Sequence, residues 1–432
     1  MTEITDSTNS LSADLSPDVT AERHKAAGAI LDDEAQEAAW PEAVARLRAG
    51  ADQGYVPSQY LLAMCLAAGR GTPADEVEAV RYLRLAADQG YTPARCQLAV
   101  CLEEGTGVAK DMVEAARYYR LAADQGHALA QQNLGVCLLS GEGVAQDAIE
   151  AVRYLQMAAE QGQAGAQCHL GICLAEGRGV AQDHAEAARY FRLVADQGFR
   201  VAQRRLGLYL ASGLGVEKDE VEAVRYVRMA ADRGDPIARF HLALFLDGGI
   251  GVAEDEVEAA RYCRLAADQG LALAQFHLAC CLDKGRGVAA DAAEAVRYFR
   301  LAADHGFPEA QCQLAICLEE GAGTAPDPAE AARYFRLAAD QGHRTAQFKL
   351  GVCLENGQGV AKDLAEAVRC YRLAADQGLP AAQCYLADFL ANGVGVEKDK
   401  AEAIRYYHLA IAQGHPEAQP SLDRLLAASP QG

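Results

Sequence analysis

The chain has 432 residues, of which 51% are hydrophobic and only 6% aromatic, with 40 glycines and one tryptophan. A composition in which alanine dominates the apolar residues is typical of closely packed helices. The 40 basic and 60 acidic residues give a formal net charge of −20. This charge argues against nucleic acid and anionic membrane surfaces as partners, because clustered Lys and Arg bind both. No apolar run approaches the roughly 18 residues of a membrane span, so we expect no membrane insertion.

The N-terminal segment differs from the rest of the chain. Residues 1–20 are rich in Ser, Thr and Asp, and we expect them to form a disordered tail. They lack the apolar core of a secretory signal, which predicts a cytoplasmic location, although export without a cleaved signal stays open. Residues 21–54 are expected to form an N-terminal cap that includes a lone helix of the second type described below.

A 36-residue repeat follows the cap. The glycine that ends the recurrent Ala-Asp-Gln-Gly segment returns every 36 residues from Gly54 to Gly414, without an insertion. Residues 55–414 are therefore interpreted as ten tandem repeats. Residues 415–432 are expected to form a C-terminal cap helix and tail.

The first half of a repeat predicts a helix and its stop. In residues 91–126, Ala94, Leu98 and Leu102 follow each other at four-residue intervals, which is a helical stripe. Gly105 and Gly107 come next, and glycine occupies both places in all ten repeats. Two glycines directly after a helical stripe favour a left-handed helix stop and a tight turn.

The second half of a repeat predicts another helix. Asp111 and Glu114 form an Asp-x-x-Glu pair that also recurs ten times, and this is the pattern of a capping box at a helix start. A single helical hairpin cannot cover an apolar first helix, so neighbouring repeats must stack. The fold class predicted is all-α, an α-solenoid of helix–turn–helix repeats.

The repeat unit Ala-x-x-x-Leu-Gly-x-x-Leu-x-x-Gly-x-Gly-Val-x-x-Asp-x-x-Glu-Ala-x-Arg-Tyr-x-Arg-Leu-Ala-Ala resembles the Sel1-like repeat (SLR) family over about residues 37–427. That family is related to the tetratricopeptide repeats. The resemblance implies a right-handed, tetratricopeptide-like superhelix that holds partner proteins. It implies roles in signalling, membrane-protein quality control or bacterial–host contact, and it implies no chemistry.

The recurring charges are interpreted as scaffold. Ten cap aspartates, ten Asp-x-x-Glu glutamates and ten acids two residues before a recurrent glycine account for half of the acidic residues. An arginine three residues after each of these glutamates shares its helix face. An acidic partner gripped by this arginine row is the alternative that we weigh less. The row is Arg81, Arg117, Arg153, Arg189, Arg225, Arg261, Arg297, Arg333, Arg369 and Arg405.

The fourteen cysteines are expected to be reduced. Seven of them share one column with Tyr209, Phe245 and Phe389, and a position that accepts Cys, Phe or Tyr is typical of a buried apolar site. No Cys-x-x-Cys or histidine cluster indicates zinc. Cys280, Cys281 and Cys370 receive no role. The column is Cys65, Cys101, Cys137, Cys173, Cys281, Cys317 and Cys353.

Catalytic motifs are missing from the sequence. No serine lies in a Ser-x-x-Lys or Gly-x-Ser-x-Gly pattern, and the histidines are dispersed over different repeats. We therefore expect no enzymatic activity, no cofactor and no metal. A hydrolase hidden among the repeats is the less favoured alternative.

One column on the first helices is the candidate partner-binding site. The residue before the recurrent leucine is polar in nearly every repeat and is never acidic, and in tetratricopeptide folds the first helix lines the concave groove. Arg204 is added because it precedes Arg205 where other repeats carry Cys or Phe. Ordinary solvated surface is the alternative. The candidate residues are Gln97, Asn133, His169, Arg204, Arg205, His241, His277, Gln313, Lys349 and Tyr385.

The sequence thus predicts a non-enzymatic scaffold or adaptor that binds a protein or an extended peptide in the concave groove of the solenoid. Because the candidate column is cationic near its middle, we expect a partner with an acidic or free-carboxylate segment. The chain itself is expected to be a monomer. An exported effector or regulator that binds host or membrane-associated proteins is the alternative.

Overall fold

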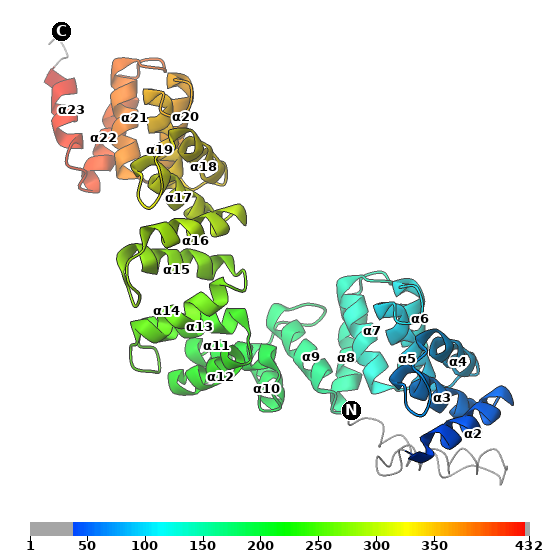
Figure 1. Ribbon diagram of the computed structural model, residues 1–432. Coiled ribbons are helices and arrows are strands. Elements are labelled where there is room, and N and C mark those ends of the chain that lie inside the picture. Colours follow the sequence, from blue (N-terminus) through cyan, green and yellow to red (C-terminus); the bar gives the residue numbers. More distant parts are fainter. Residues whose placement is uncertain (1–37, 428–432) are drawn as a thin grey trace. The chain divides into compact units, whose positions relative to one another are not determined.

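Regular secondary structure is entirely helical in the part of the chain that the structure, a computed structural model, describes, residues 38–427. These residues form two compact units, one ending at Lys218 and the other beginning at Asp219. In each unit, helices follow one another as antiparallel pairs (Figure 1). The predicted all-α solenoid of helix–turn–helix repeats is confirmed. The predicted tail 1–20, residues 21–37 of the predicted cap and residues 428–432 lie outside the described residues.

The first unit begins with a lone helix and continues with alternating first and second helices. Its helices are α2 (Trp40–Asp52), α3 (Val56–Ala68), α4 (Glu76–Asp88), α5 (Thr92–Glu104), α6 (Met112–Ala123), α7 (Ala128–Ser140), α8 (Ala148–Glu160), α9 (Ala164–Glu176), α10 (His184–Ala195) and α11 (Arg200–Ser212). Odd numbers from α3 onwards are first helices of a repeat, and even numbers from α4 onwards are second helices.

The second unit keeps the same alternation. Its helices are α12 (Glu220–Asp232), α13 (Pro236–Asp247), α14 (Glu256–Ala267), α15 (Ala272–Lys284), α16 (Ala292–Asp304), α17 (Pro308–Glu320), α18 (Pro328–Asp340), α19 (Arg344–Asn356), α20 (Leu364–Asp376), α21 (Pro380–Asn392), α22 (Lys400–Ala412) and α23 (Ala418–Ala427). Helix α2 packs against α3, and α23 packs against α22. That α2 and α23 cap the repeat array stays a proposal.

Second helices start at a capping aspartate. In α4, the carboxylate of Asp75 accepts a hydrogen bond from the backbone N–H of Glu78 at 2.8 Å, which satisfies one of the free donors of a helix start. A full capping box also has the glutamate side chain accept a hydrogen bond from the N–H of the cap residue. This part of the prediction is wrong here. The N–H of Asp75 donates to the carbonyl of Leu66, and the Glu78 side chain turns to another partner. Only one stripe of α4 is buried, as expected of an amphipathic helix.

First helices are apolar on more than one side and end at a left-handed glycine. In α5, Cys96, Leu98 and Cys101 are all buried although they point in different directions around the helix. The helix stops at Gly105, whose φ is +80°, as the sequence predicted. A first helix therefore needs its own second helix and the preceding second helix as neighbours, and α5 contacts both α6 and α4.

The second glycine of each turn has a further role, the close approach of neighbouring repeats. A Cβ placed on Gly107 would overlap the backbone carbonyl of Glu76, the first residue of α4 in the preceding repeat. The corresponding glycines meet the preceding second helix in the same way at Gly143 and Gly179. Glycine is thus required here for interhelical contact as well as for its positive φ.

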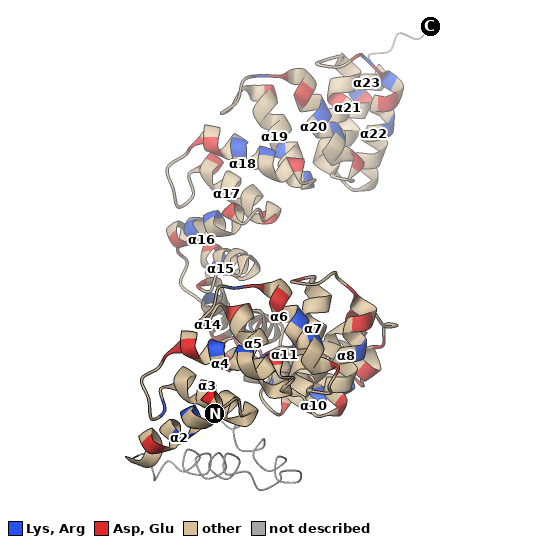
Figure 2. Cartoon of the chain, turned by 90° about the vertical axis from the view of Figure 1, so that its right-hand side faces the viewer, with Lys and Arg blue, Asp and Glu red and all other residues tan. Residues whose placement is uncertain are grey.

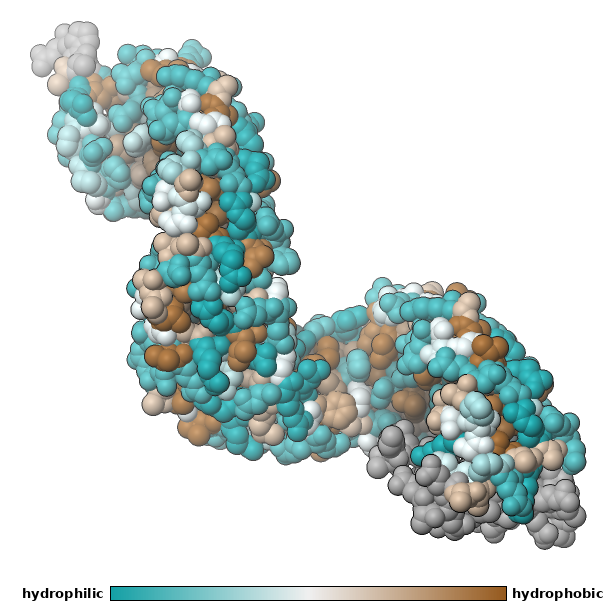
Figure 3. Space-filling model, in the orientation of Figure 1, coloured by the Kyte–Doolittle hydropathy of each residue, from teal (hydrophilic) through white to brown (hydrophobic). Residues whose placement is uncertain are grey.

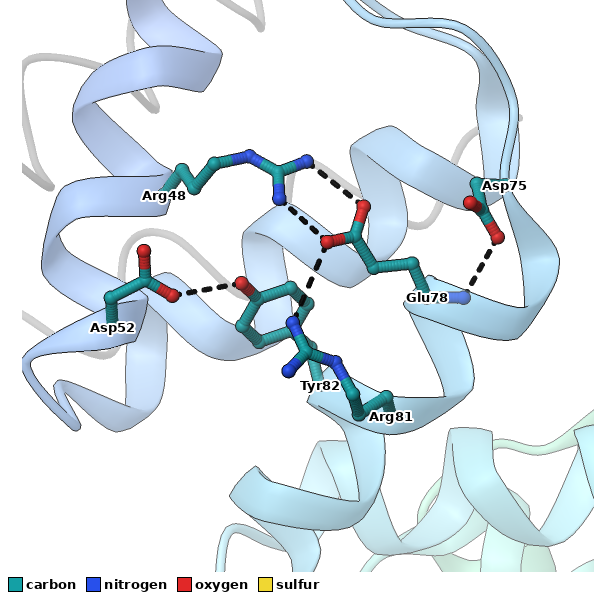
Figure 4. Close-up of polar contacts among 6 residues, drawn as sticks. All are labelled: Arg48, Asp52, Asp75, Glu78, Arg81 and Tyr82. Carbon is teal, nitrogen blue, oxygen red and sulfur yellow. Dashed lines mark hydrogen bonds and ion pairs between the residues drawn. The ribbon is translucent and has the colours of Figure 1, made fainter.

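A ladder of ion pairs joins consecutive second helices. The guanidinium of Arg48 in α2 makes a bidentate bond to Glu78 in α4 at 2.6 and 2.9 Å, and the Asp52 carboxylate accepts a hydrogen bond from the Tyr82 hydroxyl at 2.9 Å (Figure 4). Arg81 pairs with Glu78 more weakly, at 3.5 Å. The Arg–Glu bond recurs over a separation of 30 residues at Arg84–Glu114, Arg120–Glu150, Arg228–Glu258, Arg264–Glu294, Arg300–Glu330, Arg336–Glu366 and Arg372–Glu402.

The ladder is a surface feature, so each pair contributes about 0.2–1 kcal/mol. The Arg48 guanidinium lowers the pKa of the Glu78 carboxyl below its usual range. Since that pKa is lower in the folded state, the pair stabilises the fold at neutral pH, and its contribution is lost as the pH falls below about 4.

Glutamines lock most second helices to the next first helix, and Arg95 and Arg239 bond the same carbonyl in two repeats. The Nε2 group of Gln131 in α7 donates to the carbonyl of Ala123, the last residue of α6, at 3.2 Å. Its Oε1 atom accepts from Gln161 at 2.7 Å. Gln131 is fully buried, and a buried amide is tolerated only when it is hydrogen-bonded.

The cysteines lie in the interior, as predicted for their main column. Cys280 and Cys317 are half-buried, and the other twelve are buried. Burial raises the pKa of the Cys137 thiol to about 11, so little reactive thiolate exists at neutral pH. None of the fourteen forms a disulfide in the structure.

None of the helices between residues 38 and 427 is both long and apolar enough to cross a membrane.

We predict that two glycine substitutions differ sharply in cost. Gly126→Ala places a Cβ in open space at a φ of +87° and should cost about 1–2 kcal/mol from the left-handed conformation alone. Gly107→Ala adds the overlap with Glu76 and should cost about 1–3 kcal/mol more. Hydrogen exchange of the flanking helices measures both local opening free energies. Equal costs would show that the close approach is not a constraint.

The thiols give a second prediction. Unreduced protein taken from its source cells and denatured should titrate close to all fourteen cysteines, while the native chain should react slowly because its thiols are buried. A denatured count near zero would mean that the chain matures in an oxidising compartment.

Candidate functional site

The predicted polar column lies on a half-exposed side of the first helices. Nine of its ten residues are half-buried, and Tyr385 is exposed at 37%. Five candidates belong to the first unit, namely Gln97, Asn133, His169, Arg204 and Arg205. The other five belong to the second unit, namely His241, His277, Gln313, Lys349 and Tyr385. The structure therefore divides the predicted column into two shorter sets.

In the first unit, most candidates are held by groups on neighbouring helices or in their own helix turn. His169 Nδ1 lies 2.8 Å from the carbonyl oxygen of Gly165, which fixes the proton on Nδ1 because a carbonyl can only accept. Arg205 in α11 bonds Glu176 in α9 through Nη2 at 3.0 Å. Its Nε is buried without a hydrogen-bond partner in the described residues, so part of its donor capacity is unused.

In the second unit, aromatic rings join several candidates. Phe240 in α13 lies edge-on to His277 in α15 with ring centroids 5.8 Å apart. His277 is also 3.8 Å from the thiols of Cys263 and Cys281, and its burial lowers the pKa of its imidazole. It therefore stays neutral at pH values where an exposed histidine would begin to protonate. Tyr385 stacks edge-on against Phe348 at 5.2 Å.

Two cations of the polar column are neutralised by acids that lie outside the column. Lys349 in α19 pairs with Glu319 in α17 at 2.7 Å, as Arg205 pairs with Glu176. Both acids lie in the last turn of the preceding first helix. The column contains no acid, but its neighbours do, so the stripe is less cationic than its own residues suggest. Acidic and basic residues lie close together along the helices of both units (Figure 2).

A second column on the same side of the first helices was missed. Three residues after each polar position, which is one helical turn, stands a half-buried and mostly aliphatic side chain. We call this the apolar column: Met64, Val100, Val136, Ile172, Leu208, Leu244, Cys280, Ile316 and Val352, with Asp388 in the last repeat. Its recurrence is visible in the sequence, but its half-exposure is not, because core positions show the same recurrence.

The two columns together make a mixed surface. Polar and apolar side chains alternate on it within one turn, and on the face seen in Figure 3 hydrophobic residues lie singly or in small groups among hydrophilic ones. Surfaces of this kind suit contact with a polypeptide that has both apolar and polar side chains. No group of three His, Cys, Asp or Glu among residues 38–427 could hold a metal ion.

Comparison with known proteins adds the family. A model of the Sel1 repeat matches ten consecutive segments, residues 56–91, 92–127, 128–163, 164–199, 200–235, 236–271, 272–307, 308–343, 345–379 and 380–415. No curated protein sequence matches the chain.

Two solved structures share both fold and sequence. One is c5321, described as a protective antigen of uropathogenic Escherichia coli strains with an SLR fold. It is 31% identical, with a TM-score of 0.59, and the match covers 90% of this chain and 91% of that one. The other is a Sel1 repeat protein from Oxalobacter formigenes. It is 33% identical, with a TM-score of 0.55, and the match covers 72% of this chain and 89% of that one.

Proposed function

The chain belongs to the Sel1 repeat family, and on that premise we propose that it is a non-enzymatic scaffold or adaptor. Repeat solenoids of this class generally serve protein–protein interaction. The partner is a protein or an extended peptide that lies along the concave face formed by the first helices. A hydrolase is the least supported alternative.

One observation carries the proposal, the pairing of two side-chain columns on the same side of the first helices. The apolar column supplies half-exposed side chains that still have surface to bury, and the polar column supplies hydrogen-bonding groups one turn away. Most other recurrent residues already serve the scaffold, since they cap helices, join second helices or fill the core. The two columns thus retain half-exposed side chains that a partner can contact.

An acidic or free-carboxylate partner segment fits best at α11, which among the described helices α2 to α11 is the one with three arginines and no acid. Arg205 would exchange Glu176 for a partner carboxylate, and its unused Nε would gain a bond. Such an exchange gives specificity and faster association more than raw affinity.

The proposed location is the cytoplasm, and the proposed state is a monomer, because a net charge of −20 opposes self-association. One observation favours an exported effector or regulator as the alternative. The similar protein from uropathogenic E. coli is described as a protective antigen. Fractionation of the source culture into cells and medium distinguishes the two.

Photo-crosslinking in the source cells tests the scaffold function. A photoreactive phenylalanine analogue at Asn133 or Gln313, both on first helices, should crosslink to a partner protein. The same analogue at Val113 or Val257, which are about 70% exposed on second helices, serves as the control and should give far less product. Equal crosslinking from both faces, or none from the first helices, would contradict the proposal.

The acidic-partner proposal makes its own prediction. Glu176→Gln frees Arg205 and should tighten binding of a fluorescein-labelled Glu-Ala repeat peptide by about twofold to fivefold, the equivalent of one surface ion pair. Arg205→Gln should weaken binding by a similar factor and reduce its salt dependence. Fluorescence anisotropy measures both effects. Unchanged affinity in Arg205→Gln would mean that the partner is not recognised through this side chain.

A further inference from the structure

The second unit differs from the first in the charge of its first helices. In the first unit, the first helices carry four arginines, Arg95, Arg200, Arg204 and Arg205, and three acids, Glu103, Glu104 and Glu176. In the first helices α13 to α21 of the second unit, the basic residues are Arg239, Lys284, Arg344 and Lys349, and the acids are Asp247, Asp283, Glu309, Glu319, Glu320, Glu355 and Asp388. The excess acid of the second unit is concentrated in α17, which has three glutamates and no basic residue, whereas Asp283 and Lys284 balance each other in α15.

Some of these acids already have partners. Asp247 pairs with Arg286 at 2.6 Å, and Glu319 pairs with Lys349. Glu355 and Asp388 accept hydrogen bonds from the Tyr371 and Tyr407 hydroxyls at 2.6 and 2.5 Å. These four carboxylates belong to the fold.

Three acids remain exposed and form no ion pair within residues 38–427, namely Asp283, Glu309 and Glu320. Asp283 lies in the last turn of α15, directly before the exposed Lys284 that ends it, and Glu320 ends α17. Both carboxylates add to the burial that raises the pKa of the Cys317 thiol. These acids belong to two successive first helices. A carboxylate without an ion-pair partner gains free energy when an opposite charge joins it.

Exposed apolar side chains lie on the same helices. Ile237 in α13 and Leu273 in α15 are exposed at 37% and 47%. One turn further along each helix come His241 and His277, and the apolar column follows with Leu244 and Cys280. Each of these helices thus presents a stripe of three side chains at intervals of four and three residues. The order is an aliphatic group, an imidazole, and then an aliphatic group in α13 or a thiol in α15.

We propose that this surface on α13, α15 and α17 binds a polypeptide segment in which Lys or Arg alternates with aliphatic residues. The aliphatic side chains cover Ile237, Leu273 and the apolar column, while the basic groups pair with Asp283, Glu309 and Glu320. Charge complementarity selects this occupant. An acidic segment, an anionic membrane and a second copy of this chain, itself of net charge −20, are all repelled by the same carboxylates.

This inference rests on the proposed scaffold function and names the partner chemistry of its second unit. It applies to the second unit, whereas the acidic segment is proposed for α11 in the first unit.

The test uses the full-length chain and three fluorescein-labelled peptides of equal length, in which Lys, Gln or Glu alternates with leucine pairs. The Lys peptide should bind most tightly, and its affinity should fall as salt rises. The double variant Asp283→Lys/Glu320→Lys should weaken the affinity for the Lys peptide on the order of tenfold, because it reverses two charges at the surface. The fold should tolerate these changes, because cations are favoured at the C-terminal ends of helices. The double variant Ile237→Gln/Leu273→Gln should also weaken the affinity for the Lys peptide, by a factor that does not change with salt concentration.

Glu254→Lys/Glu397→Lys is the matched control. It changes the net charge by the same amount, but both residues are exposed in the loops before second helices, so the affinity for the Lys peptide should fall by less than about twofold. Equal weakening in this control, equal binding of the Glu peptide, or no preference for the Lys peptide would overturn the inference. If crosslinking at Gln313 persisted in that case, the scaffold function would stand and only the basic partner would be wrong. Loss of crosslinking from all first-helix positions would remove the function itself.

Discussion

The structure depends on one constraint, a first helix that is apolar on nearly every side and therefore cannot be covered by a single neighbour. In α5, side chains on opposite sides of the helix are buried, and α4 and α6 both pack against it. A repeat in isolation would leave one of these sides in water, at a cost of roughly 25 cal/mol for each Å² of apolar surface. Stacking is thus a condition for folding in this chain, as in other repeat arrays.

The contacts that enforce stacking explain the absence of insertions over ten repeats. Gly107 must meet the backbone of Glu76, while Arg84 must reach Glu114 and Gln131 must reach Ala123. One added residue would turn a helix by about 100° and would break several of these contacts together. The surface ion pairs of the ladder are individually weak, so their role is to fix register alongside the glycine contact and the buried glutamines.

The candidate binding surface is what remains after these demands are met. Its polar and apolar columns occupy a half-exposed side of the first helices, and the two units differ there in charge. In the first unit Arg205 retains unused donor capacity beside Glu176. In the second unit Asp283 and Glu320 lie unpaired around Cys317. A repeat scaffold can therefore vary its partner chemistry along its length without altering its core.

The sequence by itself determined the features that depend on residues near each other in the chain. These are the 36-residue repeat, the helix ends at Asp111 and Gly105, and the buried cysteine column, because caps, turns and helical stripes act over a few residues. Only the tertiary structure decided which side chains meet across repeats. By sequence, Glu114 fits a capping box with Asp111. In the structure its side chain instead bonds Arg84, which is 30 residues away. Arg205 stands in an acid-free column, yet Glu176 on the preceding first helix neutralises it, because stacking brings together long side chains whose separation in sequence carries no signal.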